Sequence, residues 1–134
     1  MRLLHTMLRV GDLQKSLDFY QNVLGMKLLR KKDYPDGRFT LAFVGYGEEA
    51  DSTVLELTHN WGTENDPAFN YHNGNSEPRG YGHICISVPD FDAAIRWFDA
   101  NHVPYQKRPE EGTMHDIAFL KDPDGYWVEI IKGC

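Results

Sequence analysis

The sequence His5-Thr-Met-Leu-Arg-Val-Gly-Asp-Leu13 returns later in the chain as His83-Ile-Cys-Ile-Ser-Val-Pro-Asp-Phe91. In both stretches a histidine opens an apolar run, and valine, aspartate and a large apolar residue follow at the same offsets. Glu56 closes the first copy of the pattern and Glu129 closes the second. The chain therefore contains a duplicated unit, and each copy carries one histidine and one glutamate at matching places.

Both copies show the same order of periodic segments. Alternating apolar residues predict strands, and apolar residues at helical spacing predict one helix near the start of each copy. The expected strands span 3–10, 26–32, 39–46 and 53–58 in the first copy, and 82–88, 105–108, 114–121 and 126–131 in the second. The expected helices follow the capping residues Asp12 and Asp90, and Gly25 ends the first helix.

This order predicts an α+β fold of two βαβββ repeats. We expect one domain over residues 1–134, with repeat 1 at about 1–58, a connecting loop at about 59–80 and repeat 2 at about 81–134. Each repeat is too small to hold a stable core alone, so it must pair with the other repeat or with another chain.

Composition excludes several classes of protein. The formal charge is −6 and the basic residues form no stripe, which argues against nucleic acid as a partner. No apolar run is long enough to cross a membrane, and Met1 leads directly into a strand pattern without a signal-peptide core. Cys85 lies within a strand and Cys134 is the last residue, which suits a reducing compartment. We therefore expect a cytoplasmic protein.

Strand parity brings the histidines and glutamates onto the polar faces of their strands. His5 shares a face with Arg9, Glu56 shares one with Asn60, and Leu55 and its apolar neighbours point the opposite way. A single histidine or glutamate on a strand is usually structural. Two matched pairs instead favour a site with two imidazole and two carboxylate ligands, which suits zinc, nickel, iron or manganese better than calcium.

The chain resembles the glyoxalase I (lactoylglutathione lyase) family of the vicinal oxygen chelate superfamily over essentially its whole length. The matching stretches are His5-Thr-Met-Leu-Arg-Val, Ser16-Leu-Asp-Phe-Tyr20, Leu24-Gly-Met26, Glu56-Leu-Thr-His-Asn-Trp-Gly62, Tyr71-His-Asn-Gly-Asn-Ser-Glu-Pro-Arg-Gly80, Gly82-His-Ile and Asp122-Pro-Asp-Gly-Tyr-Trp-Val-Glu129. The set His5, Glu56, His83 and Glu129 together with the Glu56–Gly62 run is specific to this family, whereas the paired βαβββ order indicates only the superfamily.

The resemblance implies a homodimer in which curled mixed sheets form barrels between subunits. His5 and Glu56 of one subunit are then expected to meet His83 and Glu129 of the other around one divalent metal ion. The implied substrate is the hemithioacetal of methylglyoxal and glutathione, which is isomerised to S-D-lactoylglutathione through an enediolate. For the metal, the long segment 59–80 resembles zinc-dependent members and the short turn at 45–52 resembles nickel-dependent ones, and we favour zinc over nickel.

The resemblance also assigns roles to individual residues. Glu129 is expected to be the catalytic base, with Glu56 as a second catalytic carboxylate for the opposite face of the substrate. The expected substrate-binding groups are Arg9 and Asn60 for the γ-glutamyl end, and Arg79, Lys107 and the Met114 backbone for the glycyl end. Arg108 is an alternative to Lys107, and Phe39, Leu41 and Phe43 are expected either to line the aldehyde pocket or to belong to the core.

Two other functions compete with this one. A vicinal oxygen chelate dioxygenase uses two histidines and one glutamate around iron, and the fourth ligand candidate, Glu56, argues against it. A small-molecule binding protein of the same fold would need no metal ligands. Metal analysis together with an assay for thioester formation separates the three functions.

Overall fold

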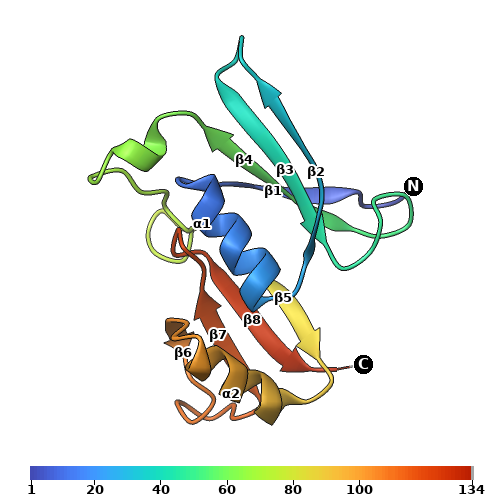
Figure 1. Cartoon of the computed structure of the whole chain (residues 1–134). Helices are drawn as coiled ribbons and strands as arrows, with labels where there is room; N and C mark the ends of the chain where they lie inside the picture. Colours follow the sequence, from blue (N-terminus) through green and yellow to red (C-terminus); the bar gives the residue numbers. More distant parts are fainter. Residues whose placement is uncertain (134) are drawn as a thin grey trace. The chain divides into compact units, whose positions relative to one another are not determined.

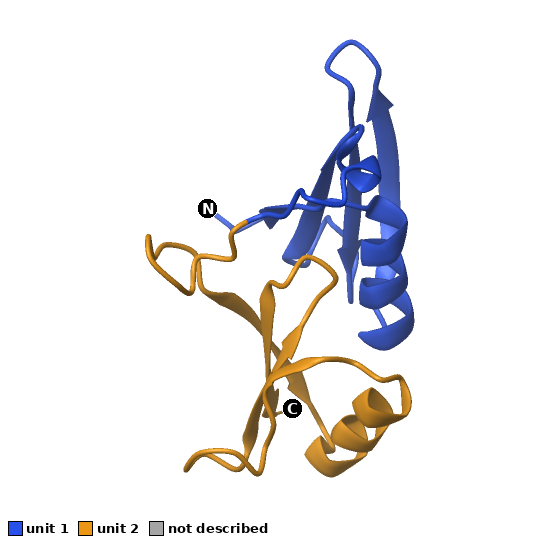
Figure 2. Cartoon of the chain, turned by 90° about the vertical axis from the view of Figure 1, so that its left-hand side faces the viewer, with its two compact units in different colours: residues 1–71 blue, residues 72–134 orange. Residues whose placement is uncertain are grey.

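The computed structural model describes residues 1–133, and the chain divides into two compact units (Figure 2). Unit 1 is Met1–Tyr71 and unit 2 begins at His72. The division falls inside the segment 59–80, which the sequence predicts to be a connecting loop.

Unit 1 has the predicted βαβββ order (Figure 1). Its elements are β1 (His5–Arg9), α1 (Leu13–Asp18), the π-helical turn η1 (Phe19–Val23), β2 (Lys27–Tyr34), β3 (Phe39–Gly45), β4 (Val54–Asn60) and the short 3-10 helix η2 (Thr63–Asn65). The strands form one sheet in the order β1-β4-β3-β2, in which β1 runs parallel to β4 and the other pairs are antiparallel. The strand that carries His5 is therefore at the edge of this sheet.

Unit 2 repeats the arrangement. Its elements are β5 (His83–Val88), α2 (Phe91–Ala100), β6 (Tyr105–Lys107), β7 (Ile117–Lys121) and β8 (Trp127–Lys132). The sheet order is β5-β8-β7-β6, with β5 parallel to β8 and the other pairs antiparallel. β5, which carries His83, again lies at the edge. The α+β class and the two mixed four-stranded sheets are confirmed.

The predicted capping residues start both helices. The Asp12 carboxylate accepts a hydrogen bond from the Lys15 backbone N–H, and Asp90 accepts one from Ala93. Gly25 follows η1 with a φ of +74°, a left-handed conformation that favours glycine. These local signals fix where each helix begins and where the first one ends.

One face of each sheet is covered by a helix and carries the apolar core (Figure 2). In unit 1 this face holds Leu57 and Val44, both fully buried, and in unit 2 it holds Val128 and Ile130, also fully buried. Because successive strand residues point to opposite faces, the alternate residues lie on the face without a helix. His5, Glu56, His83 and Glu129 all belong to that second face of their sheets.

Most element bounds differ from the prediction by one to three residues, and three of the differences have a structural reason. The α-helical segment α1 ends at Asp18, and the π turn that follows begins with the two buried rings of Phe19 and Tyr20. β4 continues to Asn60, because its last residues pair with the start of β3. β7 begins only at Ile117, since the short β6 offers it few residues to pair with.

Candidate active site

The first predicted pair of ligands meets on unit 1. β1 and β4 run in parallel with Met7 opposite Glu56, so His5 lies two residues before the position opposite the glutamate. The His5 imidazole Nε2 lies 3.3 Å from Glu56 Oε1, and the two side chains are 38% and 15% exposed. The edge strand thus presents the imidazole and the inner strand presents the carboxylate.

The second pair has the same geometry on unit 2. Cys85 lies opposite Glu129, so His83 again precedes the facing position by two residues. The His83 Nε2 atom lies 3.3 Å from Glu129 Oε1, with side chains 37% and 20% exposed. Strand register, distance and exposure therefore all repeat between the two units.

The distance within each pair fits two ligands of one metal ion. Ligand atoms about 2.1 Å from a zinc ion lie roughly 3.0 Å apart at a right angle and roughly 3.4 Å apart at the tetrahedral angle. Unit 1 also contains an imidazole–carboxylate contact of another kind, in which His59 Nε2 lies 2.7 Å from Glu64 Oε2, the distance of a charge-assisted hydrogen bond. The nitrogen and oxygen donors of the two longer pairs suit zinc or nickel.

A phenylalanine next to each pair orients the imidazole. Phe43 of β3 lies opposite Glu56, and its ring meets the His5 ring edge-on at 5.5 Å and 79°. Phe119 of β7 lies opposite Glu129, and its ring meets His83 at 5.0 Å and 80°. Such edge-to-face contacts are favourable and restrict rotation of the smaller ring. The sequence singled out Phe43 only as a pocket or core residue and did not single out Phe119.

The two carboxylates differ in their other hydrogen-bond partners. Glu56 Oε2 accepts a hydrogen bond of 2.9 Å from the hydroxyl of Thr58. Glu129 instead accepts from the thiol of Cys85. Desolvation, the hydrogen bond to Glu129 and the negative charge of that carboxylate raise the pKa of Cys85 to about 11, so at neutral pH the thiol keeps its proton and acts as a donor. Neither partner was identified from the sequence.

Within residues 1–133, no group of three or more His, Cys, Asp or Glu side chains is arranged to hold a metal ion. Unit 1 contributes the pair His5 and Glu56, and unit 2 contributes the pair His83 and Glu129. Each unit thus carries one imidazole and one carboxylate of the four predicted ligands.

The two substrate-binding candidates of unit 1 lie on the same face as Glu56. Arg9 lies opposite Thr58, and Asn60 is the last residue of β4, four residues beyond Glu56. Both are therefore on the face without a helix, as strand parity predicts. Arg9 is exposed and Asn60 is half-buried.

Three candidates of unit 2, Lys107, Met114 and Arg108, lie close together near β6. The Lys107 ammonium donates to the carbonyl oxygens of Met114 at 2.7 Å and Ile117 at 3.0 Å, so Lys107 and Met114 lie together. Arg108 donates to both carboxylate oxygens of Asp99 and to Glu110, and these hydrogen bonds raise the pKa of Arg108. Both cations are engaged, the Arg108 guanidinium by two carboxylates and the Lys107 ammonium by three backbone carbonyl oxygens, including that of Arg108 at 3.3 Å. Charged carboxylates compete more strongly with a substrate anion than neutral carbonyls do, which favours Lys107 over Arg108 as the substrate contact.

The remaining candidate, Arg79, lies in the segment between η2 and β5. Its guanidinium Nε is 3.5 Å from Glu77 Oε1, and the two side chains are 76% and 83% exposed. An ion pair this exposed contributes little energy and leaves Arg79 able to turn toward another anion.

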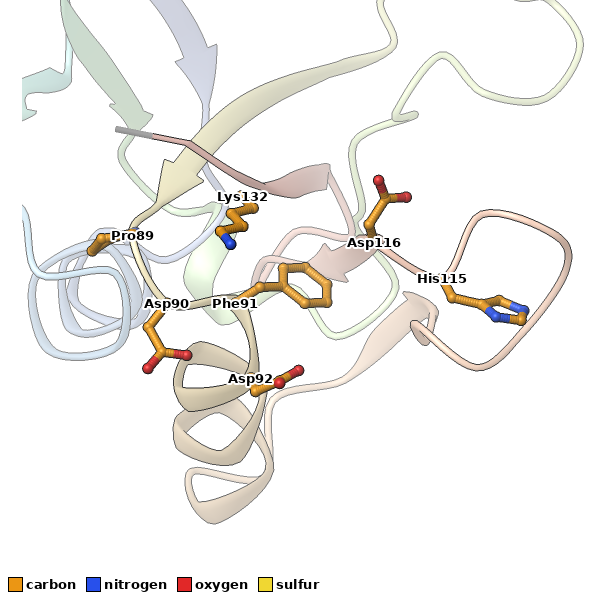
Figure 3. Close-up of a pocket in the computed structure, with 7 residues that line it drawn as sticks. All are labelled: Pro89, Asp90, Phe91, Asp92, His115, Asp116 and Lys132. Carbon is orange, nitrogen blue, oxygen red and sulfur yellow. The ribbon is translucent and has the colours of Figure 1, made fainter.

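Two cavities lie on the helix-covered faces rather than beside the His/Glu pairs. One, of about 510 Å³, lies at the start of α2 and is lined by Asp90, Phe91, Asp92, Lys132 and neighbouring residues (Figure 3). The other, of about 320 Å³, lies between α1 and the sheet of unit 1 and includes Trp61 in its lining. Neither is lined by a predicted metal ligand, so these cavities are separate from the candidate site.

The Glyoxalase/Bleomycin resistance protein/Dioxygenase superfamily matches residues 2–130. The chain belongs to this superfamily. A relative from Neisseria meningitidis called lactoylglutathione lyase is 60% identical over 134 residues, which cover 98% of this chain and 91% of the relative. The lactoylglutathione lyase of Pseudomonas putida is 52% identical over 143 residues, which cover 96% of this chain and 83% of that protein. The predicted resemblance to the glyoxalase I family is confirmed.

A solved glyoxalase structure has the same fold. The trypanothione-dependent glyoxalase I of Leishmania major is 44% identical, with a TM-score of 0.82 over 98% of this chain and 86% of that one. None of the helices in residues 1–133 has the length and apolar character needed to span a membrane.

Proposed function

We infer that this protein is a metal-dependent lactoylglutathione lyase that isomerises the hemithioacetal of methylglyoxal and glutathione to S-D-lactoylglutathione. The activity follows from its lactoylglutathione lyase relatives, which are 52% and 60% identical over nearly the whole chain. The observation that supports metal dependence is the repeated pair of His Nε2 and Glu Oε1 atoms 3.3 Å apart, one pair on each unit.

The active site is proposed to form between two copies of the chain, with barrels built from the sheets of both. His5 and Glu56 of one subunit then face the ion together with His83 and Glu129 of the other. Exposed apolar side chains near β1 support a homodimer, since Leu3 is 67% exposed, Leu4 55% and Met7 38%. The edge position of β1 and β5 also leaves one side of each strand free for further contacts.

The difficult step is removal of a proton from a weak carbon acid. A divalent ion, when bound, supplies Lewis acidity toward the two adjacent oxygens of the substrate. Glu129 takes the proton from C1, the hemithioacetal carbon, and returns it to C2, the neighbouring carbonyl carbon. To reach both carbons, the carboxylate must move away from its resting position. Glu56 is the second carboxylate of the proposed site and faces the opposite side of the substrate. Phe43 and Phe119 keep the two imidazoles oriented throughout.

The glutathione part of the substrate carries two carboxylates, and the chain provides cations for both. Arg9 and Asn60 are proposed to bind the γ-glutamyl end, because they share the Glu56 face of unit 1. Lys107, the Met114 backbone and Arg79 are proposed to bind the glycyl end from the partner subunit. Charge-assisted hydrogen bonds of this kind fix the orientation of the reacting carbons relative to Glu129.

Reconstitution tests the proposed metal dependence and the choice of metal. Apo protein is loaded in parallel with zinc, nickel and cobalt, and thioester formation is followed by absorbance with glutathione and methylglyoxal. We expect both the zinc-loaded and the nickel-loaded protein to be active at neutral pH under reducing conditions, and the zinc-loaded protein to be the more active of the two. If full activity persists without metal, metal dependence is wrong. A protein that neither binds metal nor makes thioester would instead be a binding protein of this fold.

Mixing variants tests whether the site lies between subunits. His5→Ala and His83→Ala are each expected to be inactive, but a refolded mixture should recover roughly a quarter of native activity, because half of the dimers are hybrids and each hybrid retains one intact site. A mixture of His5→Ala with Glu56→Ala is the matched control and should recover none. If the first mixture stays inactive although the hybrids form, a site between subunits is excluded.

A further inference from the structure

Each carboxylate oxygen of Glu56 has a close side-chain neighbour, and one of the two is a hydrogen-bond donor. Oε1 faces the His5 imidazole at 3.3 Å, and Oε2 accepts the Thr58 hydroxyl at 2.9 Å. Thr58 follows Glu56 by two residues on β4, so both side chains stand on the same face of an inner strand. Thr58 is only 8% exposed, which shields this hydrogen bond from competing water.

The matching position in unit 2 has no hydroxyl. Glu129 corresponds to Glu56, and the residue two positions further along β8 is Ile131. The residue opposite Glu129 is Cys85 of β5, whereas the residue opposite Glu56 is Met7, which has no proton to donate. A thiol is a weaker hydrogen-bond donor than a hydroxyl. The two units therefore share the carboxylate but differ in the side chains around it, a hydroxyl in unit 1 and a thiol in unit 2.

This difference makes the two carboxylates unequal in mobility. Threonine is branched at Cβ and has few accessible side-chain rotamers, so its hydroxyl stays directed at Glu56. Movement of Glu56 away from its place would break a hydrogen bond to an ionised group and leave a shielded hydroxyl without an acceptor. Movement of Glu129 gives up less, because the donor opposite it is an exposed thiol rather than a shielded hydroxyl.

We propose that Thr58 is the positioning residue that keeps Glu56 a fixed ligand, and that the absence of a hydroxyl at position 131 leaves Glu129 free to leave the ion and carry the proton. This inference rests on the proposed function, since it explains how two like carboxylates of one site take different parts. It assigns the difference to a single hydroxyl group rather than to the carboxylates or to the fold.

The first experiment removes the hydroxyl from unit 1. Thr58→Val keeps the shape of the side chain and Thr58→Ser keeps the hydroxyl. Zinc and nickel dissociation constants are measured by competition with a chelator. We expect Thr58→Val to weaken metal binding by about 10–100-fold, as is typical for partners of metal ligands, and Thr58→Ser to restore binding close to the native value. Equal affinities of Thr58→Val and the native protein would overturn the proposal.

The second experiment moves the hydroxyl to unit 2. Ile131→Thr places it two residues after Glu129, and Ile131→Val is a control of the same shape without the hydroxyl. In metal-saturated protein we expect Ile131→Thr to lower kcat by about 10-fold relative to Ile131→Val, with KM nearly unchanged and metal bound at least as tightly, because Glu129 is now held. If the two variants have equal kcat, the proposal is wrong even if Thr58→Val does not fold.

Failure of this inference is distinguishable from failure of the proposed function. The function fails if the native protein, saturated with zinc or nickel, makes no thioester from methylglyoxal and glutathione. The inference fails if the native protein is active but the paired variants at positions 58 and 131 behave alike. The metal affinities of the Thr58 variants are measured without substrate. They therefore test the role of Thr58 whether or not the native protein makes thioester.

Discussion

Units 1 and 2 present the same arrangement of histidine, glutamate and phenylalanine in different surroundings. The His–Glu distances are equal and the ring contacts nearly so, yet Thr58 donates to one carboxylate and Cys85 to the other. Phe43 is 3% exposed, whereas Phe119 is half-buried. The features that repeat are those that the two ligand pairs of the proposed metal site would need. The features that differ indicate separate tasks for the two halves.

The largest effect is expected from the two carboxylates themselves. In metal-replete protein Glu129→Gln should lower kcat by about 10²–10⁴-fold, because the general base is lost, while metal content falls less. Glu56→Gln, the matched change in unit 1, should lower metal affinity more and kcat less. Steady-state kinetics and metal analysis of both variants check this difference. Native-like turnover of metal-replete Glu129→Gln would remove Glu129 from the role of base.

The next largest effect is expected on KM, and it distinguishes Lys107 from the neighbouring Arg108. Lys107→Ala should raise KM by about 10–100-fold, because a hydrogen bond to a substrate carboxylate is lost, and Lys107→Arg should recover part of the binding. Arg108→Ala should leave KM unchanged, because Asp99 and Glu110 already engage its guanidinium. Kinetics with varied hemithioacetal check both. A larger KM change in Arg108→Ala would exchange the two roles.

The smallest effect concerns the rings beside the imidazoles. Phe43→Leu should destabilise the protein by about 1 kcal/mol because the ring is buried, and Phe119→Leu should cost less because its ring is partly exposed. Thermal unfolding of the apo variants measures the difference. Both should also weaken metal binding slightly by loosening His5 or His83. An unchanged metal affinity in both variants would limit the rings to a packing role.

The sequence predicted what depends on local pattern. The βαβββ order, the caps at Asp12 and Asp90 and the shared face of His5 and Arg9 all follow from residue spacing. The extension of β4 to Asn60 did not, because polar residues at a strand end join the sheet only if a partner strand reaches that far. Pairing with β3 depends on the folded sheet and cannot be predicted from the residues around Asn60 alone.

The pairing of one histidine with one glutamate on each unit was predictable, but the groups around each pair were not. Repetition pointed to the four histidine and glutamate residues, but nothing in the sequence indicated that Thr58 donates to Glu56 or that Cys85 donates to Glu129. Such contacts depend on rotamers and on strand register, which spacing alone leaves open. Comparing the residues that follow each glutamate by two positions, a threonine and an isoleucine, is the signal that would have revealed the difference.

In the proposed dimer, the edge placement of β1 and β5 would link association of the chains to metal binding. The strands that carry the imidazoles are also those with a free side available to a second chain. By mass action, whatever favours association of the chains then favours ion capture, and the ion in turn holds the chains together. Apparent metal affinity should therefore fall as the protein is diluted, and chelation should shift the molecule toward monomers.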